Sequence, residues 1–334
     1  MRITTELLLK NAVDAVAERC QGNKDIAAAY LCGSVLGEKP LLGGTTDIDL
    51  VFIHQGEIVE ERQIVRLTAD VHLDIQHHTK SRYEQARELR QEPWLGWTLF
   101  DARPMYDPDH FLDFVQANLR GMFNSPENIL KRAQSLLGNA REIWLQHHNN
   151  PSQLAVHQVR DFIRALQNAV NAVACLSGPP LAERRLLLDY LKRVEEVRQP
   201  GLYAGVLGLL GLAETGKEDI ESWLNHWKQA FNKVNELDNT PVGLHQDRTA
   251  YYQRAIEAIL ISEHPKAAAW PLLSTWTKMA VVLPEESTEA LAWKRILDAL
   301  EFTGQGFEQR MQGLDTYLDR IEELIEYWQK EWQK

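Results

Sequence analysis

Two aspartates, Asp47 and Asp49, are separated by one residue in a stretch that is otherwise apolar up to Ile53. In an extended strand, residues two apart leave the same face, with Cα atoms roughly 6.5–7 Å apart. Both carboxylates therefore point the same way, while Ile48 and Leu50 point into the core. Carboxylate oxygens are ligands that Mg²⁺ prefers, and burying two like charges without a cation is costly. The pair indicates a site for divalent cations.

A third carboxylate, Asp74, lies in the next apolar stretch, Val71–His77, which alternates strictly and predicts a strand. Asp74 falls on the face opposite the apolar residues of that strand. If the strand neighbours the one with Asp47 and Asp49 in register, the three carboxylates form one site. Asp74 is then placed to bind a second metal ion and to accept the proton of an attacking hydroxyl.

A Gly-Ser pair, Gly33-Ser34, follows the apolar block Ile26–Cys32. The periodicity of that block allows either a helix or a strand, and the glycine and turn that follow favour a strand. Glycine lets the backbone approach a ligand closely, and the next N–H groups and the serine hydroxyl are suited to holding phosphate oxygens. Gly33 and Ser34 are therefore candidate nucleotide-binding residues.

The three motifs together resemble the nucleotidyltransferase superfamily that includes DNA polymerase beta. The motifs are Leu31-Cys32-Gly33-Ser34, Thr45-Thr46-Asp47-Ile48-Asp49-Leu50-Val51-Phe52 and Leu73-Asp74. With the helical region behind them, the chain looks like the bacterial aminoglycoside nucleotidyltransferases in particular. The resemblance implies a mixed sheet, two Mg²⁺ ions, an NTP donor that is most often ATP, and transfer of a nucleoside monophosphate with release of pyrophosphate.

The resemblance also implies a role for each matched residue. Gly33 and Ser34 would hold the donor phosphates, and Thr46 would occupy the small hydroxylated position before the first aspartate. The catalytic, metal-binding carboxylates would be Asp47, Asp49 and Asp74.

The pattern of elements predicts an α+β protein of two domains. Residues 1–110 are predicted to form a small mixed-sheet catalytic domain. Its expected helical segments are a first helix over Thr4–Cys20, a polar helix over Glu57–Ala69 and a helical stretch to about Gln91, and a short piece at Arg103–Asp107 completes it. Residues 111–334 read as an all-α helical-bundle domain for acceptor binding or interaction. Its expected breaks are Asn149-Asn150-Pro151, Ser177-Gly178-Pro179-Pro180, Gln199-Pro200-Gly201, Asn239-Thr240-Pro241 and Gly304-Gln305-Gly306.

Composition narrows the range of partners. With 44% hydrophobic and 25% charged residues, the chain has the composition of an ordinary globular protein. The net charge of −11 disfavours long nucleic acids and fits a cationic or neutral small-molecule acceptor, or another protein. No stretch reaches the ~20 apolar residues of a membrane span, so no membrane partner and a cytoplasmic location are expected.

Other residues have two interpretations each. Lys80, Arg82 and Arg103 follow the carboxylate strands and are able to contact phosphates, although exposed surface charge is the simpler explanation. The tryptophan pairs Trp223/Trp227 and Trp328/Trp332 favour helix packing. Trp94, Trp97, Trp270 and Trp276 either pack in a core or line an acceptor pocket.

The leading functional hypothesis is an enzyme that transfers a nucleoside monophosphate to a hydroxyl of a small molecule, such as an aminoglycoside. An alternative keeps the chemistry and modifies a protein side chain (AMPylation). An RNA-tailing enzyme fits the acidic chain poorly. A catalytically silent nucleotide-binding or interaction protein is the alternative from a different class, since function follows the site and not the fold.

Overall fold

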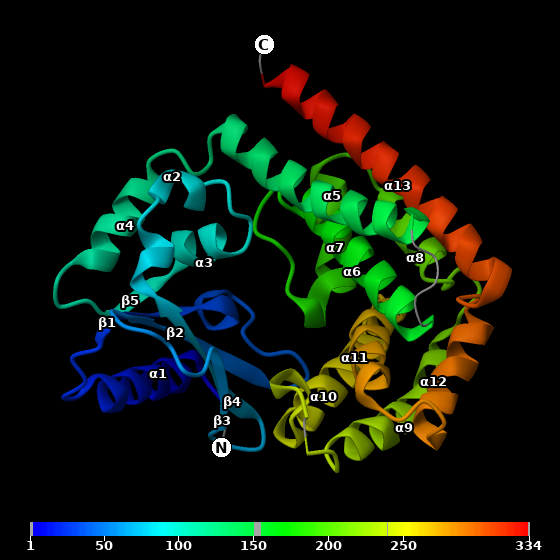
Figure 1. Ribbon diagram of the computed structural model, residues 1–334, viewed down its shortest axis with the longest axis horizontal. Coiled ribbons are helices and arrows are strands. Elements are labelled where there is room, and N and C mark those ends of the chain that lie inside the picture. The colour runs from blue at the N-terminus through cyan, green and yellow to red at the C-terminus, as the bar shows by residue number, and fades with distance from the viewer. Residues whose placement is uncertain (1–2, 150–154, 239, 333–334) are drawn as a thin grey trace. The chain divides into compact units, whose positions relative to one another are not determined.

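A computed structural model describes residues 3–149, 155–238 and 240–332 of the chain (Figure 1). The chain forms two compact units, residues 1–128 and residues 129–334. The first unit combines a sheet with helices, and the second is helical, which confirms the predicted α+β class. No helix within the described residues is both long and apolar enough to cross a membrane.

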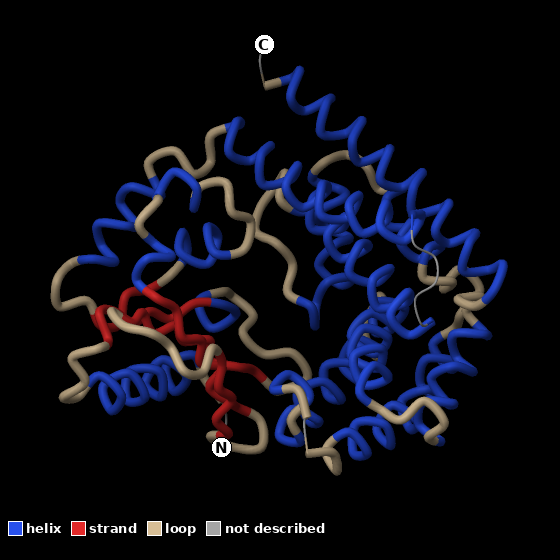
Figure 2. The backbone as a smooth tube through the Cα atoms, viewed as in Figure 1, coloured by secondary structure: helices blue, strands red, loops and turns tan. Residues whose placement is uncertain are grey.

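The first unit is built on a five-stranded mixed sheet with the order β3-β4-β2-β1-β5. The strands are drawn in red in Figure 2. Strands β2 and β4 run parallel, and the other neighbouring pairs are antiparallel. The strands are β1 (Ile26–Cys32), β2 (Thr46–His54), β3 (Arg62–Arg66), β4 (Val71–Thr79) and β5 (Arg103–Tyr106). The α-helices are α1 (Thr5–Cys20), α2 (Ala86–Leu89), α3 (Leu95–Asp101) and α4 (Phe111–Arg120), with short 3-10 helices at Gly33–Leu36 and Lys80–Tyr83.

Each face of the sheet has its own apolar core, because successive strand residues point to opposite faces. One face packs against α1 and is centred on Ile48, Leu50 and Phe52 of β2. The hydroxyl of Thr4 accepts a hydrogen bond from the backbone N–H of Leu7 and caps this helix. The opposite face packs against α3 and α4, and its β2 residues are Val51 and Ile53 (Figure 1). Asp47 and Asp49 share the alternation of this second face.

The polar helix expected over Glu57–Ala69 is absent, and β3 occupies its centre. Two β-branched residues, Ile64 and Val65, lie in the middle of this strand, and such side chains favour extended backbone. The Thr68 hydroxyl accepts hydrogen bonds from the backbone N–H groups of Asp70 and Val71, which builds the turn into β4. The polar composition of the segment reflects an exposed edge strand.

The first unit extends beyond residue 110, where the sequence had suggested a boundary. Helix α4 contributes Leu112, Val115 and Leu119 to the core on the sheet, and Phe123 follows them. The chain passes from one unit to the other inside α5 (Pro126–Asn149), which begins at a proline, a residue favoured at the first position of a helix. An amphipathic helix has the same pattern whether it packs on a sheet or on helices, so the boundary is not visible in the sequence.

The second unit is built from helices around α11 (Ala269–Val282), whose residues from Ala269 to Thr277 are all buried. The other α-helices are α6 (Ala155–Ala174), α7 (Leu186–Glu196), α8 (Gly201–Leu209), α9 (Lys217–Val234), α10 (Thr249–Leu260), α12 (Thr288–Ala299) and α13 (Gly304–Glu331). The breaks expected near residues 177–180, 199–201 and 304–306 fall between or at the ends of helices. Asn150, Pro151 and Asn239 lie outside the described residues.

Side chains in the second unit are fixed by buried polar contacts. Trp227 is fully buried and its indole N–H donates to the Thr275 hydroxyl at 2.8 Å. The hydroxyls of Tyr190 and Tyr317 lie 2.7 Å apart in the interior, and burial raises the pKa of both phenols. Trp270 and Trp276 are also buried, so they pack in the core of this unit.

Arg141 on α5 links three carboxylates of α13. Its guanidinium donates to Asp315 at 2.5 Å, to Asp319 at 2.7 Å and to Glu322 at 2.9 Å. These hydrogen bonds raise the pKa of Arg141 against the opposing effect of its partial burial. The three carboxylates lie on one helix and repel one another, so the arginine neutralises a local excess of negative charge.

Replacing Arg141 with Met should lower the free energy of unfolding by about 1–2 kcal/mol, because the three carboxylates lose their shared partner. The measurement is chemical denaturation followed by circular dichroism at low and high salt. Lys330→Met is the control, since Lys330 makes a single exposed i,i+4 pair with Glu326. Equal stability of the Arg141 and Lys330 variants would show that the network adds nothing.

Candidate active site

The parallel pairing of β2 and β4 brings the three predicted carboxylates to one face of the sheet. Asp49 lies directly opposite Asp74, and Asp47 lies opposite His72. Only 4% of Asp47 and 3% of Asp74 is exposed, whereas Asp49 is half-buried. The expected convergence of Asp74 with the Asp-x-Asp pair is thus present in the strand register.

Gly33 lies against the Asp49 carboxylate. Its φ is +75°, in the left-handed region that favours glycine, and a Cβ at this position would lie 2.0 Å from Asp49 Oδ2. Cys32 pairs with Asp49 across β1 and β2. Burial, followed by the charges of Asp49 and Asp74, raises the pKa of the Cys32 thiol well above its usual range. The end of β1 is therefore fitted around the carboxylate, and Cys32 is a neutral neighbour of the site.

Ser34 and Thr46, the two predicted nucleotide-binding hydroxyls, lie together at the start of β2. Their side-chain oxygens are 3.2 Å apart, and the Thr46 hydroxyl also donates to the backbone carbonyl of Asp47. Thr46 is fully buried, while Ser34 is partly exposed. Ser34 is the hydroxyl that a ligand can reach, and Thr46 holds it in place.

Arg62 of β3 is part of this site and was not found in the sequence. Its Nε donates to Asp74 Oδ1 at 2.8 Å and its Nη2 to Asp74 Oδ2 at 2.5 Å, a two-pronged ion pair. The Arg62 side chain is 44% exposed, whereas the Asp74 side chain is 4% exposed. Arg62 compensates the charge that burial of Asp74 would otherwise leave unbalanced. The assumed helix over Glu57–Ala69 hid this contact, and the β-branched pair Ile64-Val65 was the signal for a strand.

His72 is the second residue that the sequence left without a role. It is fully buried, and its Nδ1 lies 3.6 Å from Asp47 Oδ1. That distance is too long for a hydrogen bond. Because it lies opposite Asp47 in the register, His72 lines the carboxylate site.

The fit of this face to a divalent cation rests on Asp47 and Asp49. Both supply hard oxygen donors on one face, and the glycine at position 33 leaves the space that a side chain would fill beside Asp49. Among the residues that the structure describes, no cluster of three or more His, Cys, Asp or Glu side chains is arranged to hold a metal ion. Arg62 bonds both oxygens of Asp74.

A hydrogen-bonded chain lies on the same face of the sheet as the carboxylates. The hydroxyls of Tyr30 and Tyr83 are 3.1 Å apart, and the Tyr83 hydroxyl also bonds Nδ1 of His78. Burial raises the pKa of both phenols. Burial, with smaller effects of Arg82 and His77, lowers the pKa of His78 to about 4. These groups are therefore neutral at pH 7.

Three other residues singled out in the sequence are Lys80, Arg103 and Trp97. The Lys80 ammonium lies 4.7 Å from the centre of the Phe111 ring, which is a cation–π contact. Arg103 is exposed on β5, at the other end of the sheet from β3. Trp97 packs edge-on against Phe123.

Gly33→Ala should weaken Mg²⁺-ATP binding more than tenfold, because the new methyl displaces the Asp49 carboxylate. Gly44→Ala is a matched control, since Gly44 has a φ of +76° and nothing lies within 4 Å of its Cβ position. Both variants carry the same backbone strain, of order 1–2 kcal/mol. Titration calorimetry and thermal unfolding of the two proteins check this. Equal binding by both variants would show that the Gly33–Asp49 contact does not matter.

The buried His78 should make stability fall as the pH is lowered from about 6.5 to about 4. The unfolded chain takes up the proton near the ordinary pKa, whereas the folded chain resists until the lowered pKa is reached, so protonation favours unfolding. His78→Gln should show a shallower fall of the melting temperature over this range. His110→Gln is the control, because His110 is exposed and its pKa is raised by Asp113. An unchanged slope in the His78 variant would contradict the assignment.

Comparisons with known proteins give little beyond this geometry. No protein-family model matches the chain, and no curated protein matches it. Among solved structures, the chain is similar to a nucleotidyltransferase-like protein from Exiguobacterium sibiricum, with 12% sequence identity over 88% of this chain and 89% of that one, and a TM-score of 0.31. A TM-score of this size is too low to carry fold or function from that protein to this chain.

Proposed function

We propose that the chain is a metal-dependent nucleotidyltransferase that moves a nucleoside monophosphate from an NTP, taken as ATP from the motif resemblance, to a hydroxyl of a small molecule. The observation that carries the proposal is the register that sets Asp49 beside Asp74 with Asp47 on the same face. Gly33 and Ser34 lie at the end of the neighbouring strand, where the motif resemblance expects the donor phosphates.

Asp47 and Asp49 are the proposed ligands of Mg²⁺. Magnesium bound there would neutralise phosphate charge and favour departure of pyrophosphate. The Asp49 carboxylate is half-buried, and the side chain of Asp47 lies toward His72. Gly33 presents its backbone without a side chain, and the Ser34 hydroxyl donates to a phosphate oxygen.

Asp74 is the proposed acceptor of the hydroxyl proton. The hydroxyl oxygen forms a bond to the α-phosphorus, the bond from that phosphorus to the pyrophosphate oxygen breaks, and the proton passes to a carboxylate oxygen of Asp74. One oxygen of Asp74 must exchange its Arg62 hydrogen bond for the hydroxyl, and Arg62 can keep the other. The two-pronged geometry makes this partial release possible.

A catalytically silent nucleotide-binding protein is the second candidate, and the same ion pair favours it. Arg62 satisfies both oxygens of Asp74, so the pair is stable without any ligand. In that case Asp47 and Asp49 would bind nucleotide and metal, and no transfer would follow. Turnover separates the two candidates.

Asp49→Asn should abolish Mg²⁺-ATP binding in titration calorimetry, because a neutral amide is a poor magnesium ligand. Asp14→Asn makes the same charge change on the exposed face of α1 and should bind as the wild type does. Binding that survives in the Asp49 variant, or is absent from all three proteins, would remove the metal-nucleotide proposal. Pyrophosphate release with an acceptor panel that includes aminoglycosides then distinguishes the enzyme from the silent protein.

A further inference from the structure

A pocket of about 290 Å³ lies along the second half of β4. Arg62 connects the two, since it lines the pocket and bonds Asp74. Gln76 and His78 follow Asp74 on the same face of the strand, and both line the pocket. The remaining lining residues are Ile58, Glu61, His77, Thr79 and Arg82. The volume suits a small ligand or one end of a larger one.

Arg82 supplies the positive charge of this pocket. Two cations, Arg62 and Arg82, and one acid, Glu61, line it, and Arg62 is already bonded to Asp74. Arg82 makes no hydrogen bond or ion pair with any residue in the described part of the chain. Its charge is nevertheless felt nearby, because it helps to lower the pKa of His78. An arginine in this setting is suited to a two-pronged contact with phosphate or carboxylate.

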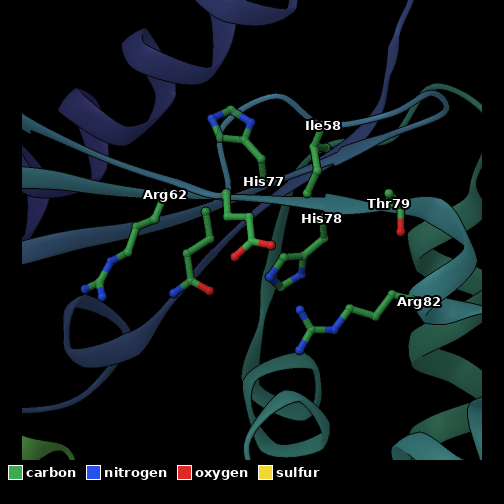
Figure 3. Close-up of a pocket in the computed structure, with 8 residues that line it drawn as sticks. Ile58, Arg62, His77, His78, Thr79 and Arg82 are labelled. Carbon is green, nitrogen blue, oxygen red and sulfur yellow. The ribbon is translucent and has the colours of Figure 1, made fainter. Parts of the chain in front are cut away.

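The side chains around Arg82 offer further hydrogen bonds. In Figure 3, the His78 ring and the Arg82 guanidinium lie on the same side of β4 and point toward one another. The Thr79 hydroxyl lies 3.1 Å from the Ser81 hydroxyl, whereas the His77 ring points to the opposite side of the strand. His77 is bonded there to His54, whose other nitrogen bonds Asp25. Arg82, His78 and Thr79 therefore form the polar wall that a ligand would meet.

We infer that this pocket binds an anionic group, a phosphate or a carboxylate, of the acceptor molecule, with Arg82 as its main contact. The inference rests on the proposed function, which identifies the ligand as the acceptor molecule. The order β3-β4-β2-β1 places β2 between this pocket and Gly33-Ser34, so donor phosphates held at Gly33-Ser34 lie on the other side of Asp49. The pocket instead shares Arg62 with Asp74, the carboxylate proposed to receive the proton of the acceptor hydroxyl.

The local charge of the pocket differs from that of the chain. The net charge of −11 suggested a cationic acceptor such as an aminoglycoside. A polycationic ligand placed here would lie against the positive charge of Arg82. Glu61 is the single carboxylate lining the pocket among the described residues, and it cannot offset the charges of both Arg82 and the ligand. Short-range contacts outweigh the remote surface charges, which salt screens beyond roughly 10 Å.

The test is binding of inorganic phosphate and of citrate, measured by titration calorimetry with 0.1 M sodium chloride. Wild type should bind at least one of the two saturably, and Arg82→Gln should weaken that binding about tenfold or more. Arg82→Lys should retain part of it, since the charge remains and the two-pronged geometry is lost. Arg87→Gln removes an exposed arginine of α2 that does not line the pocket, and should match the wild type.

Three results would overturn the inference. The first is saturable binding that is equal in wild type and Arg82→Gln, and the second is no binding of either anion. The third is displacement of phosphate or citrate by Mg²⁺-ATP, which would assign the pocket to the donor. Asp49→Asn separates this inference from the proposed function, because this variant should no longer bind Mg²⁺-ATP and should still bind the anion through Arg82. If the wild type binds the anion but does not bind Mg²⁺-ATP, the proposed function is removed and the anion pocket stays in place.

Discussion

The parallel pairing of β2 with β4 is the constraint on which the candidate site depends. A shift of one residue in this register would move Asp74 to the face covered by α1, into an apolar core. The register is held because each strand has one apolar face that packs on α1, with Ile48, Leu50 and Leu73 among its members. Packing on one face of the sheet thus fixes the positions of the carboxylates on the other.

Two further contacts adapt this frame to charged groups. Acidic side chains taken out of water require a partner, and Arg62 provides one for Asp74 from the edge strand β3. Glycine at position 33 makes room for Asp49, which leaves that carboxylate half-buried and able to meet a ligand. The three carboxylates share a face and differ in their surroundings, which is why we assign them different roles.

Most of the carboxylate site could be predicted from the sequence. Strict alternation over Val71–His77 fixed the face of Asp74, and the spacing of Asp47 and Asp49 fixed theirs, since both signals are local. Arg62 and His72 could not be assigned, because their roles come from cross-strand neighbours that the sequence does not name. The edge strand β3 was mistaken for a helix because a short, exposed strand has too few apolar residues to show alternation. The roles of the residues in binding and catalysis stay predictions.

The two phenol pairs, Tyr30 with Tyr83 and Tyr190 with Tyr317, have a consequence for optical spectroscopy. One pair lies in each unit, and all four phenols have a raised pKa. An exposed tyrosine ionises near pH 10 and its absorption then shifts to longer wavelength. These four stay protonated in the folded chain at that pH and ionise once their unit opens. Phenolate absorbance under alkaline conditions is therefore an intrinsic reporter of opening that needs no added dye.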